Sequence, residues 1–93
     1  MRVISNKALI EFAAKHPDAG VPLQLWRKTV EAGTYASFAD LKKAFNATDK
    51  VGKFYVFDIG GNKFRLIAAV HFDVQKLYVR YVFTHKEYNR WKP

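Results

Sequence analysis

The 93-residue sequence contains no cysteine, which excludes a disulfide framework and a metal site built from thiolates. It also lacks an apolar run near the ~20 residues that a membrane span needs. The first residues, MRVISNKALIEF, do not have the long apolar stretch of a signal peptide. Together these absences predict a cytoplasmic protein that folds without disulfides.

Acidic residues are few as well: 8 Asp and Glu stand against 16 Lys and Arg, so the net charge is +8. The basic excess is larger in residues 51–93 than in residues 1–50. Such an excess on a small domain indicates a polyanionic partner, usually nucleic acid or a ribosome. The alternative is a basic surface that only keeps the protein soluble.

Hydrophobic residues suffice for one core. They make up 49% of the chain and aromatic residues 16%, which argues against disorder. A chain of this length buries a little over ~60% of its unfolded surface, so one core of modest size is the limit. Because no internal repeat or linker interrupts the chain, residues 1–93 are predicted to form a single domain.

Helical patterns occupy the first half of the chain, after a short apolar RVI that is a candidate strand. One apolar stripe predicts a helix from Ser5 or Asn6 to about Lys15, where His16-Pro17 ends it. The segment SFADLKKAF has the start signature of a short third helix. Between them a second helix is predicted over residues 19–32, with a buried side made of Val21, Leu25, Thr29 and Ala32.

After Val51 the chain turns to runs rich in β-branched and aromatic residues. Three strands are predicted, FYVFDI, KFRLIAAVHF and LYVRYVFT, with turns at GG or GGN and at DVQK. Helices followed by an antiparallel meander define an α+β protein, whose N-terminal helices pack on one face of a small antiparallel sheet. The uncertain length of the first turn leaves the faces of Tyr55 and Phe57 open.

The last two predicted strands form a hairpin with one apolar and one basic face. With DVQK as a four-residue loop, Ala69 pairs with Arg80, and Arg65 pairs with Thr84. The apolar face then gains Leu77, Val79, Tyr81 and Phe83. The opposite face collects Lys63, Arg65, His71, Tyr78, Arg80 and Thr84. Arg65 is therefore expected at the surface, where its truncation costs no more than ~0.5 kcal/mol.

The stretch THKEYNRW follows the last predicted strand. Thr84 and Glu87 have capping-box spacing, which predicts a short C-terminal helix, and Trp91 is expected to pack back on the sheet. Cleaving RNA without a metal needs a base, an acid and cations near the phosphorane. The stretch supplies side chains that can carry protons: His85, Lys86 and Tyr88. A carboxylate cluster or paired histidines for a metal are not seen in the sequence.

Two long segments, YVFDIGGNKFRLIAAVHF and LYVRYVFTHKEYNRW, and the opening ISNKALIEFAAKHPDA resemble the HigB toxins of type II toxin–antitoxin systems, within the RelE/ParE superfamily. The resemblance implies a RelE-like fold and metal-independent, cofactor-free cleavage of mRNA in the ribosomal A site, leaving a 2′,3′-cyclic phosphate. It also implies neutralisation by a helix-turn-helix antitoxin of the HigA type. Operator DNA would be met only through the antitoxin complex.

Residue by residue, the resemblance and the basic sheet face give two predicted groups. The catalytic group is Arg65, His85, Lys86 and Tyr88. The RNA-contacting group is Lys53, Asn62, Lys63, His71 and Arg80. Arg65 and Arg80 are expected to grip phosphate in a bidentate way, with Lys86 or His85 as base and Tyr88 or His85 as acid. Family members often have Asp where this chain has Asn89, and His71 is equally explained as a sheet histidine without a ligand.

Two other functions remain open at this point. A gyrase inhibitor of the ParE branch shares the implied fold, although the THKEY constellation speaks against it. A non-catalytic module that blocks translation by occupying RNA would show the same charge and the same sheet face.

Overall fold

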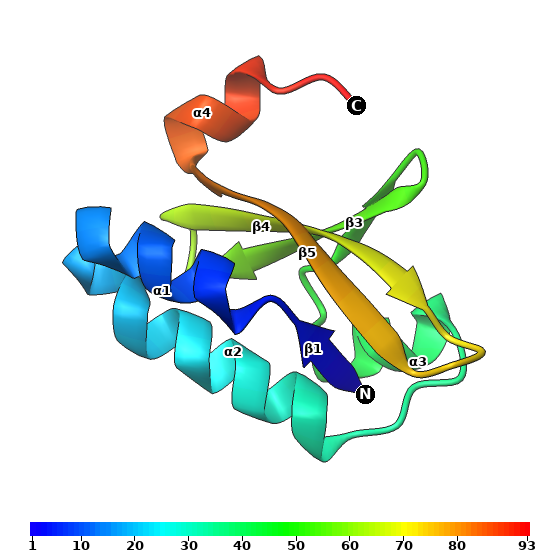
Figure 1. The fold of residues 1–93 in the computed structure, drawn as a ribbon. Coiled ribbons are helices and arrows are strands. Elements are labelled where there is room, and N and C mark those ends of the chain that lie inside the picture. Colours follow the sequence, from blue (N-terminus) through cyan, green and yellow to red (C-terminus); the bar gives the residue numbers. More distant parts are fainter.

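A five-stranded sheet in the order β1-β5-β4-β3-β2 runs through the protein (Figure 1). The computed structural model describes all residues, 1–93. The strands are β1 (Arg2–Ile4), β2 (Asp49–Val51), β3 (Phe54–Ile59), β4 (Phe64–His71) and β5 (Lys76–Thr84). The helices are α1 (Asn6–Lys15), α2 (Gly20–Ala32), α3 (Phe38–Ala44) and α4 (His85–Arg90), with a short 3-10 helix, η1 (Pro17–Ala19), before α2.

The predicted α+β class is confirmed, and neighbouring strands from β2 to β5 pair antiparallel. The prediction of a purely antiparallel sheet is wrong at one edge, where β1 lies parallel to β5. Strand β2 was not predicted, because it has only three residues and its exposed Asp49 and Lys50 give no apolar alternation. None of the helices has the length and apolar character needed to cross a membrane.

The helix boundaries follow local signals. The first helix spans the predicted residues and ends at His16, whose φ of −131° and ψ of 79° leave the helical region just before Pro17. The Ser37 hydroxyl accepts a hydrogen bond from the Asp40 N–H at 3.4 Å, which is the cap expected for α3. Helix α2 begins at Gly20 rather than Ala19, because η1 takes up the residues after His16.

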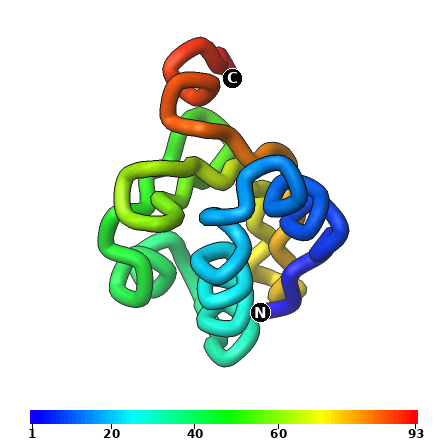
Figure 2. The backbone as a smooth tube through the Cα atoms, turned by 90° about the vertical axis from the view of Figure 1, so that its left-hand side faces the viewer, coloured from blue at the N-terminus to red at the C-terminus, as the bar shows by residue number.

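Helices α1 and α2 lie side by side over one face of the sheet, as Figures 1 and 2 show from two directions. Leu9 from α1 and Leu23 from α2 join Phe57 and Leu66 from the sheet in a cluster of 17 buried residues. The Trp26 and Phe57 rings meet edge to face, with centroids 5.3 Å apart. This layer between helices and sheet is the core of the protein.

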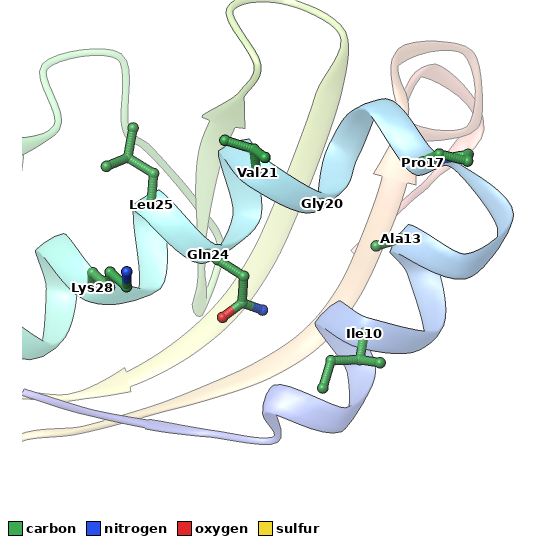
Figure 3. Close-up of a pocket in the computed structure, with 8 residues that line it drawn as sticks. All are labelled: Ile10, Ala13, Pro17, Gly20, Val21, Gln24, Leu25 and Lys28. Atoms are coloured by element: carbon green, nitrogen blue, oxygen red, sulfur yellow. The ribbon is translucent and has the colours of Figure 1, made fainter.

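The buried side of α2 is not the predicted one. The residues expected to be buried are exposed: Val21, Leu25, Thr29 and Ala32. The residues that face the core are Leu23, Trp26 and Val30. Both sets of residues fit the period of a helix. The set that packs against the sheet is the one that buries the large Trp26 ring. Val21 and Leu25, 81% and 64% exposed, instead line a groove of about 610 Å³ with Ile10 of α1 (Figure 3).

A β-bulge in β5 changes the predicted register. Ala68 pairs with Val79 but Ile67 pairs with Tyr81, so Arg80 is an extra residue between two ladder pairs. Ala69 lies before the bulge and pairs with Tyr78, because the loop between β4 and β5 is residues 72–75 and not the predicted 73–76. The predicted pairing of Arg80 with Ala69 is therefore wrong. Arg65 pairs with Phe83, one residue before the predicted Thr84.

The bulge reverses the side-chain alternation in the second half of β5. Leu77 and Val79 are buried in the core as predicted. Beyond the bulge, Val82 packs against the core, while Tyr81 and Phe83 turn to the opposite face of the sheet. The placement of these two rings in the core was wrong, because one inserted residue shifts a two-residue alternation to the other face.

The loop between β3 and β4 settles the faces of β3. Ile59 pairs with Phe64, so the connection is a four-residue loop, 60–63. Its Gly60 has φ 62°, a left-handed conformation that glycine adopts without a steric cost. In this register Tyr55 and Phe57 both belong to the core.

The two faces of α2 allow a test with neighbouring leucines. Leu23→Ala should lower the free energy of unfolding by about 2–5 kcal/mol, because Leu23 is completely buried and its truncation leaves a cavity. Leu25→Ala should change it by no more than ~0.5 kcal/mol, since Leu25 is largely exposed. Urea unfolding followed by circular dichroism measures both values, and equal losses would show that the faces are assigned wrongly.

Candidate active site

We call the sheet face opposite α1 and α2 the open face. Strand pairing places Asp58, Arg65 and Phe83 in one row across this face, and Val56 and Ile67 in the next. Val56 and Ile67 are only 2% and 0% exposed, although α1 and α2 lie on the other side of the sheet. Other side chains therefore cover this part of the open face.

An aromatic cluster provides that cover and anchors the C-terminal segment. The Trp91 ring centroid lies 5.7 Å from that of Phe54, 6.2 Å from Tyr81 and 6.3 Å from Phe83. Tyr81 and Phe83, the two rings that the bulge turns outward, stack on each other at 5.2 Å. The expectation that Trp91 packs back on the sheet is confirmed, and α4 is held beside β4 and β5 (Figure 1).

The predicted capping box of α4 is present. The Thr84 hydroxyl accepts a hydrogen bond from the Glu87 N–H at 3.2 Å, and Glu87 Oε1 accepts one from the Thr84 N–H at 2.8 Å. The bond from the Thr84 N–H is the main reason that the pKa of Glu87 lies below its usual value, and the charges of His16 and Lys15 add to it. The capping box fixes where α4 begins and hence where its side chains project.

His85 and Lys86 lie in the first turn of α4 with exposed side chains. The His85 N–H donates to the Lys63 carbonyl at 3.0 Å, which ties α4 to the loop before β4. The Lys63 ammonium lies 3.7 Å from an Asp18 carboxylate oxygen. An ion pair this exposed is worth about 0–1 kcal/mol, so Asp18 holds the Lys63 side chain only weakly.

Arg65 is the most constrained side chain of the site. It lies on the open face as predicted, but it is only 8% exposed, so the expected surface position was wrong. Its Nε lies 3.1 Å from Asp58 Oδ1, and its Nη1 donates to the carbonyls of Asn62 and Phe64 at 3.3 and 3.1 Å. Its Nη2 donates to Asn62 Oδ1 at 2.6 Å. The Tyr88 ring covers the guanidinium, with its centroid 5.7 Å from Arg65 Cζ.

These contacts limit how Arg65 can meet a phosphate. A guanidinium has five N–H donors, and the partners of Arg65 engage all but one on Nη2. The predicted bidentate grip therefore requires Asn62 to release its side-chain bond. Because Asn62 is exposed in a loop, a rotation of its side chain is sufficient.

Asp58 is the site residue that the sequence did not indicate. It pairs with Arg65 across β3 and β4, and its side chain is 32% exposed. The sequence feature that could have indicated it is a pair of opposite charges, Asp58 and Arg65, on either side of the GGN turn. Opposite charges stabilise a hairpin when they face each other across its strands. Whether they face each other depends on the length of the loop, which the sequence alone left open.

Three other predicted residues gather farther along the open face. The Lys53 Nζ lies 5.4 Å from the Phe54 ring, and the Arg80 Cζ lies 5.3 Å from the Tyr78 ring. The His71 ring meets the same Tyr78 ring at 5.4 Å. His71 is six residues from Arg65 on β4, which is about 20 Å at ~3.3 Å per residue. The structure thus divides the predicted residues into one group around Arg65 and another around Arg80.

The class of protein to which the chain belongs follows from its similarity to known sequences. The profile of the HigB toxin family, the RelE-like toxic component of a toxin–antitoxin system, matches residues 19–91. The chain belongs to this family of HigB toxins. Membership makes it the toxic half of such a system, whose other half is an antitoxin.

Individual relatives support the same membership. The protein named mRNA interferase toxin HigB from Escherichia coli strain K12 is 39% identical over 92 residues, which is 96% of this chain and 88% of the relative. The mRNA interferase HigB of Shigella flexneri has the same identity and coverage. The mRNA interferase HigB of Escherichia coli O6:H1 is 28% identical over 93 residues, which is 97% of this chain and 90% of the relative. The family resemblance seen in the sequence motifs is confirmed.

The contact between Arg65 and Asp58 is expected to stabilise the fold. Arg65→Ala should lower the free energy of unfolding by about 1–3 kcal/mol, because it leaves a carboxylate and two carbonyl oxygens without their donor. Urea unfolding of Arg65→Ala, Asp58→Ala and the double variant measures the coupling energy between the two side chains.

The Arg27–Glu31 pair of α2 is the matched control. Its charged atoms are 3.3 Å apart, and its side chains are 33% and 34% exposed, close to the value for Asp58. A helical pair of this kind contributes about 0.3–0.5 kcal/mol. A coupling energy no larger than this for Arg65 and Asp58 would mean that their contact does not support the fold.

Proposed function

We propose that the protein is an mRNA endoribonuclease that acts as the toxin of its toxin–antitoxin pair. Relatives that are 39% identical over 96% of the chain are named mRNA interferase. The observation that carries the proposal is the packing of the Tyr88 ring against the Arg65 guanidinium. This contact joins α4, with His85 and Lys86 in its first turn, to the buried cation of the sheet.

The proposed reaction is attack of a ribose 2′-oxygen on the adjacent phosphorus. A new P–O bond forms while the bond to the 5′-oxygen breaks, so the products are a 2′,3′-cyclic phosphate and a 5′-hydroxyl. A base takes the proton of the 2′-OH, and an acid gives a proton to the departing 5′-oxygen. Cations stabilise the negative charge that builds up on the phosphorane.

The side chains around Arg65 match these three needs. Arg65 places a fixed positive charge beside the phosphorane, because Asp58 and the carbonyls of Asn62 and Phe64 hold its guanidinium. Lys86 or His85 serves as base, since both side chains are exposed in the first turn of α4. Tyr88 serves as acid, because its ring lies directly against the cation that contacts the phosphate.

Proton transfer is assigned to these side chains and not to a metal-bound water. No three His, Asp or Glu side chains come close enough together to hold a metal ion. The two carboxylates nearest the cluster are already engaged, Asp58 with Arg65 and Glu87 with Thr84. A metal would therefore have to compete with contacts that hold Arg65 and α4 in place.

The proposed substrate is mRNA in the ribosomal A site, a setting in which a net charge of +8 favours binding. The antitoxin is proposed to be a helix-turn-helix protein of the HigA type. The toxin would then meet operator DNA only within the complex with that antitoxin. The proposed site of action is the cytoplasm, where ribosomes translate mRNA.

Expression without antitoxin should arrest growth and create new 5′ ends inside the coding regions of translated mRNAs. Tyr88→Phe keeps the ring against Arg65 and Trp91 but removes the acid, so it should slow cleavage by about 10²–10⁴-fold. Growth curves and mapping of mRNA 5′ ends measure the two effects.

Tyr78→Phe is the matched control, because Tyr78 is also a half-buried tyrosine of the open face but lies under Arg80. Its cleavage should equal that of the wild type. Growth arrest with intact transcripts would contradict the nuclease and favour a gyrase inhibitor or an RNA-blocking module. Cutting of transcripts that lack a start codon would contradict ribosome dependence alone.

The ends of the fragments test the chemistry. The upstream fragment should carry a 2′,3′-cyclic phosphate or a 3′-phosphate, because the 2′-oxygen stays bonded to phosphorus. Cleavage should also survive chelation of divalent ions under conditions that keep the ribosomes intact. A 3′-hydroxyl end, detected by enzymatic ligation or mass spectrometry, would indicate attack by water and overturn the proposed reaction.

A further inference from the structure

A cleft of about 340 Å³ opens on the sheet beyond the aromatic cluster. Three strands supply its walls, and the small side chain of Ala69 leaves room between them. The lining residues are Lys53 in the turn before β3, Phe54 at the start of β3, Ala69, Val70 and His71 from β4, and Arg80 and Tyr81 from β5. The volume is at the lower end of the range for ligand pockets, about 300–1,000 Å³.

The basic side chains around this cleft have no acidic partner. Lys53, His71 and Arg80 take part in none of the ion pairs of the protein, whereas Lys63 and Arg65 near the active site do. Lys53 and Arg80 instead lie over the rings of Phe54 and Tyr78. Such cation–π contacts hold a cation in position and leave its charge available. The cleft is therefore suited to an anion.

Exposed aromatic surface is the second component of the cleft. Tyr81 is 46% exposed, and Phe54 is half-buried beside it. Unpaired bases stack on aromatic side chains whatever their sequence, and neighbouring cations bind the backbone. The larger groove between α1 and α2 has a single basic side chain, Lys28, and no aromatic ring, so it offers neither a pair of cations nor a stacking surface.

We propose that this cleft is a subsite for one unpaired nucleotide of the mRNA, separate from the cluster at which the chain is cut. Arg80 and Lys53 bind its phosphate, and Tyr81 stacks on its base. His71 stands at the edge of the same subsite, fixed by its contact with Tyr78. This assignment rests on the proposed function, since it names a further part of the same substrate.

The position of the cleft indicates what the subsite does. Ala69 is four residues from Arg65 on β4, which is about 13 Å at ~3.3 Å per residue. Stacked nucleotides advance about 3.4 Å each, so the bound nucleotide lies up to about four positions from the cleaved bond. Because the subsite contacts no reacting atom, it decides how tightly and where the message is held.

Binding to a short single-stranded RNA labelled with fluorescein tests the subsite without any cleavage. Lys53→Ala and Arg80→Ala should each weaken binding about fivefold or more and reduce the slope of log affinity against log salt by about 0.7. Lys43→Ala removes an exposed lysine of α3 and is the matched control for the loss of charge alone. Its binding should stay within about twofold of the wild type. Thermal melts confirm that each variant is folded.

Mapping of cut sites then tests the effect on the message. The Lys53→Ala/Arg80→Ala double variant should change the bases found within about four positions of the cut, which is the reach of the stacked strand. In single-turnover cleavage it should need a higher concentration of programmed ribosomes to reach its half-maximal rate, because two groups that hold the message are lost. Tyr88→Phe should show the reverse, with a slower rate at unchanged cut sites.

Three results would overturn this inference. Binding and cut sites equal to those of Lys43→Ala would exclude the subsite and leave the nuclease proposal standing. Weaker binding to ribosomes with unchanged cut sites would exclude the message as the source of the nucleotide and point to ribosomal RNA. If the wild type binds the oligonucleotide but never cleaves mRNA, the proposed function fails. The subsite then fails too, because it was assigned to an mRNA that the protein cleaves.

Discussion

The open face depends on one constraint, the extra residue that Arg80 inserts into β5. The bulge turns Tyr81 and Phe83 away from the core, so that Val82 packs against the core instead. The two rings then form the surface on which Trp91 packs, and so hold α4 at the end of the sheet. Arg80 itself leaves the ladder and lies over Tyr78. Bulges often re-aim side chains next to functional sites, and here one bulge serves both groups of residues.

Elements encoded by nearby residues could be predicted from the sequence. The end of α1 is set by His16-Pro17, and the start of α4 by Thr84 and Glu87, each within a few positions. The register of β5 could not be predicted, because neither the position of the loop after His71 nor the bulge at Arg80 follows from an alternation pattern. The buried side of α2 was ambiguous for a similar reason: its two stripes have equal periods, and only the sheet beneath selects Trp26.

The members of the candidate site were easier to predict than their contacts. The motifs GGNKFRL and THKEY do meet, through Arg65 and Tyr88. The burial of Arg65 was missed, since it depends on Asp58 across the hairpin and on the loop that aligns them. Arg65 therefore supports the fold besides its proposed role in cleavage, so loss of activity on its truncation has two explanations. Tyr88 can lose its hydroxyl and keep its packing, which makes it the cleaner probe.

Helix α4 has only 6 residues, too few for a helix to be stable in water by itself. Its neighbours are β4 and β5, and it keeps its place through one capping box and the packing of Trp91. A segment with so few buried contacts opens at a small fraction of the free energy that unfolds the whole domain. His85, Lys86 and Tyr88, the proposed proton carriers, therefore lie in the part of the chain that is expected to open first, while the sheet beneath stays native.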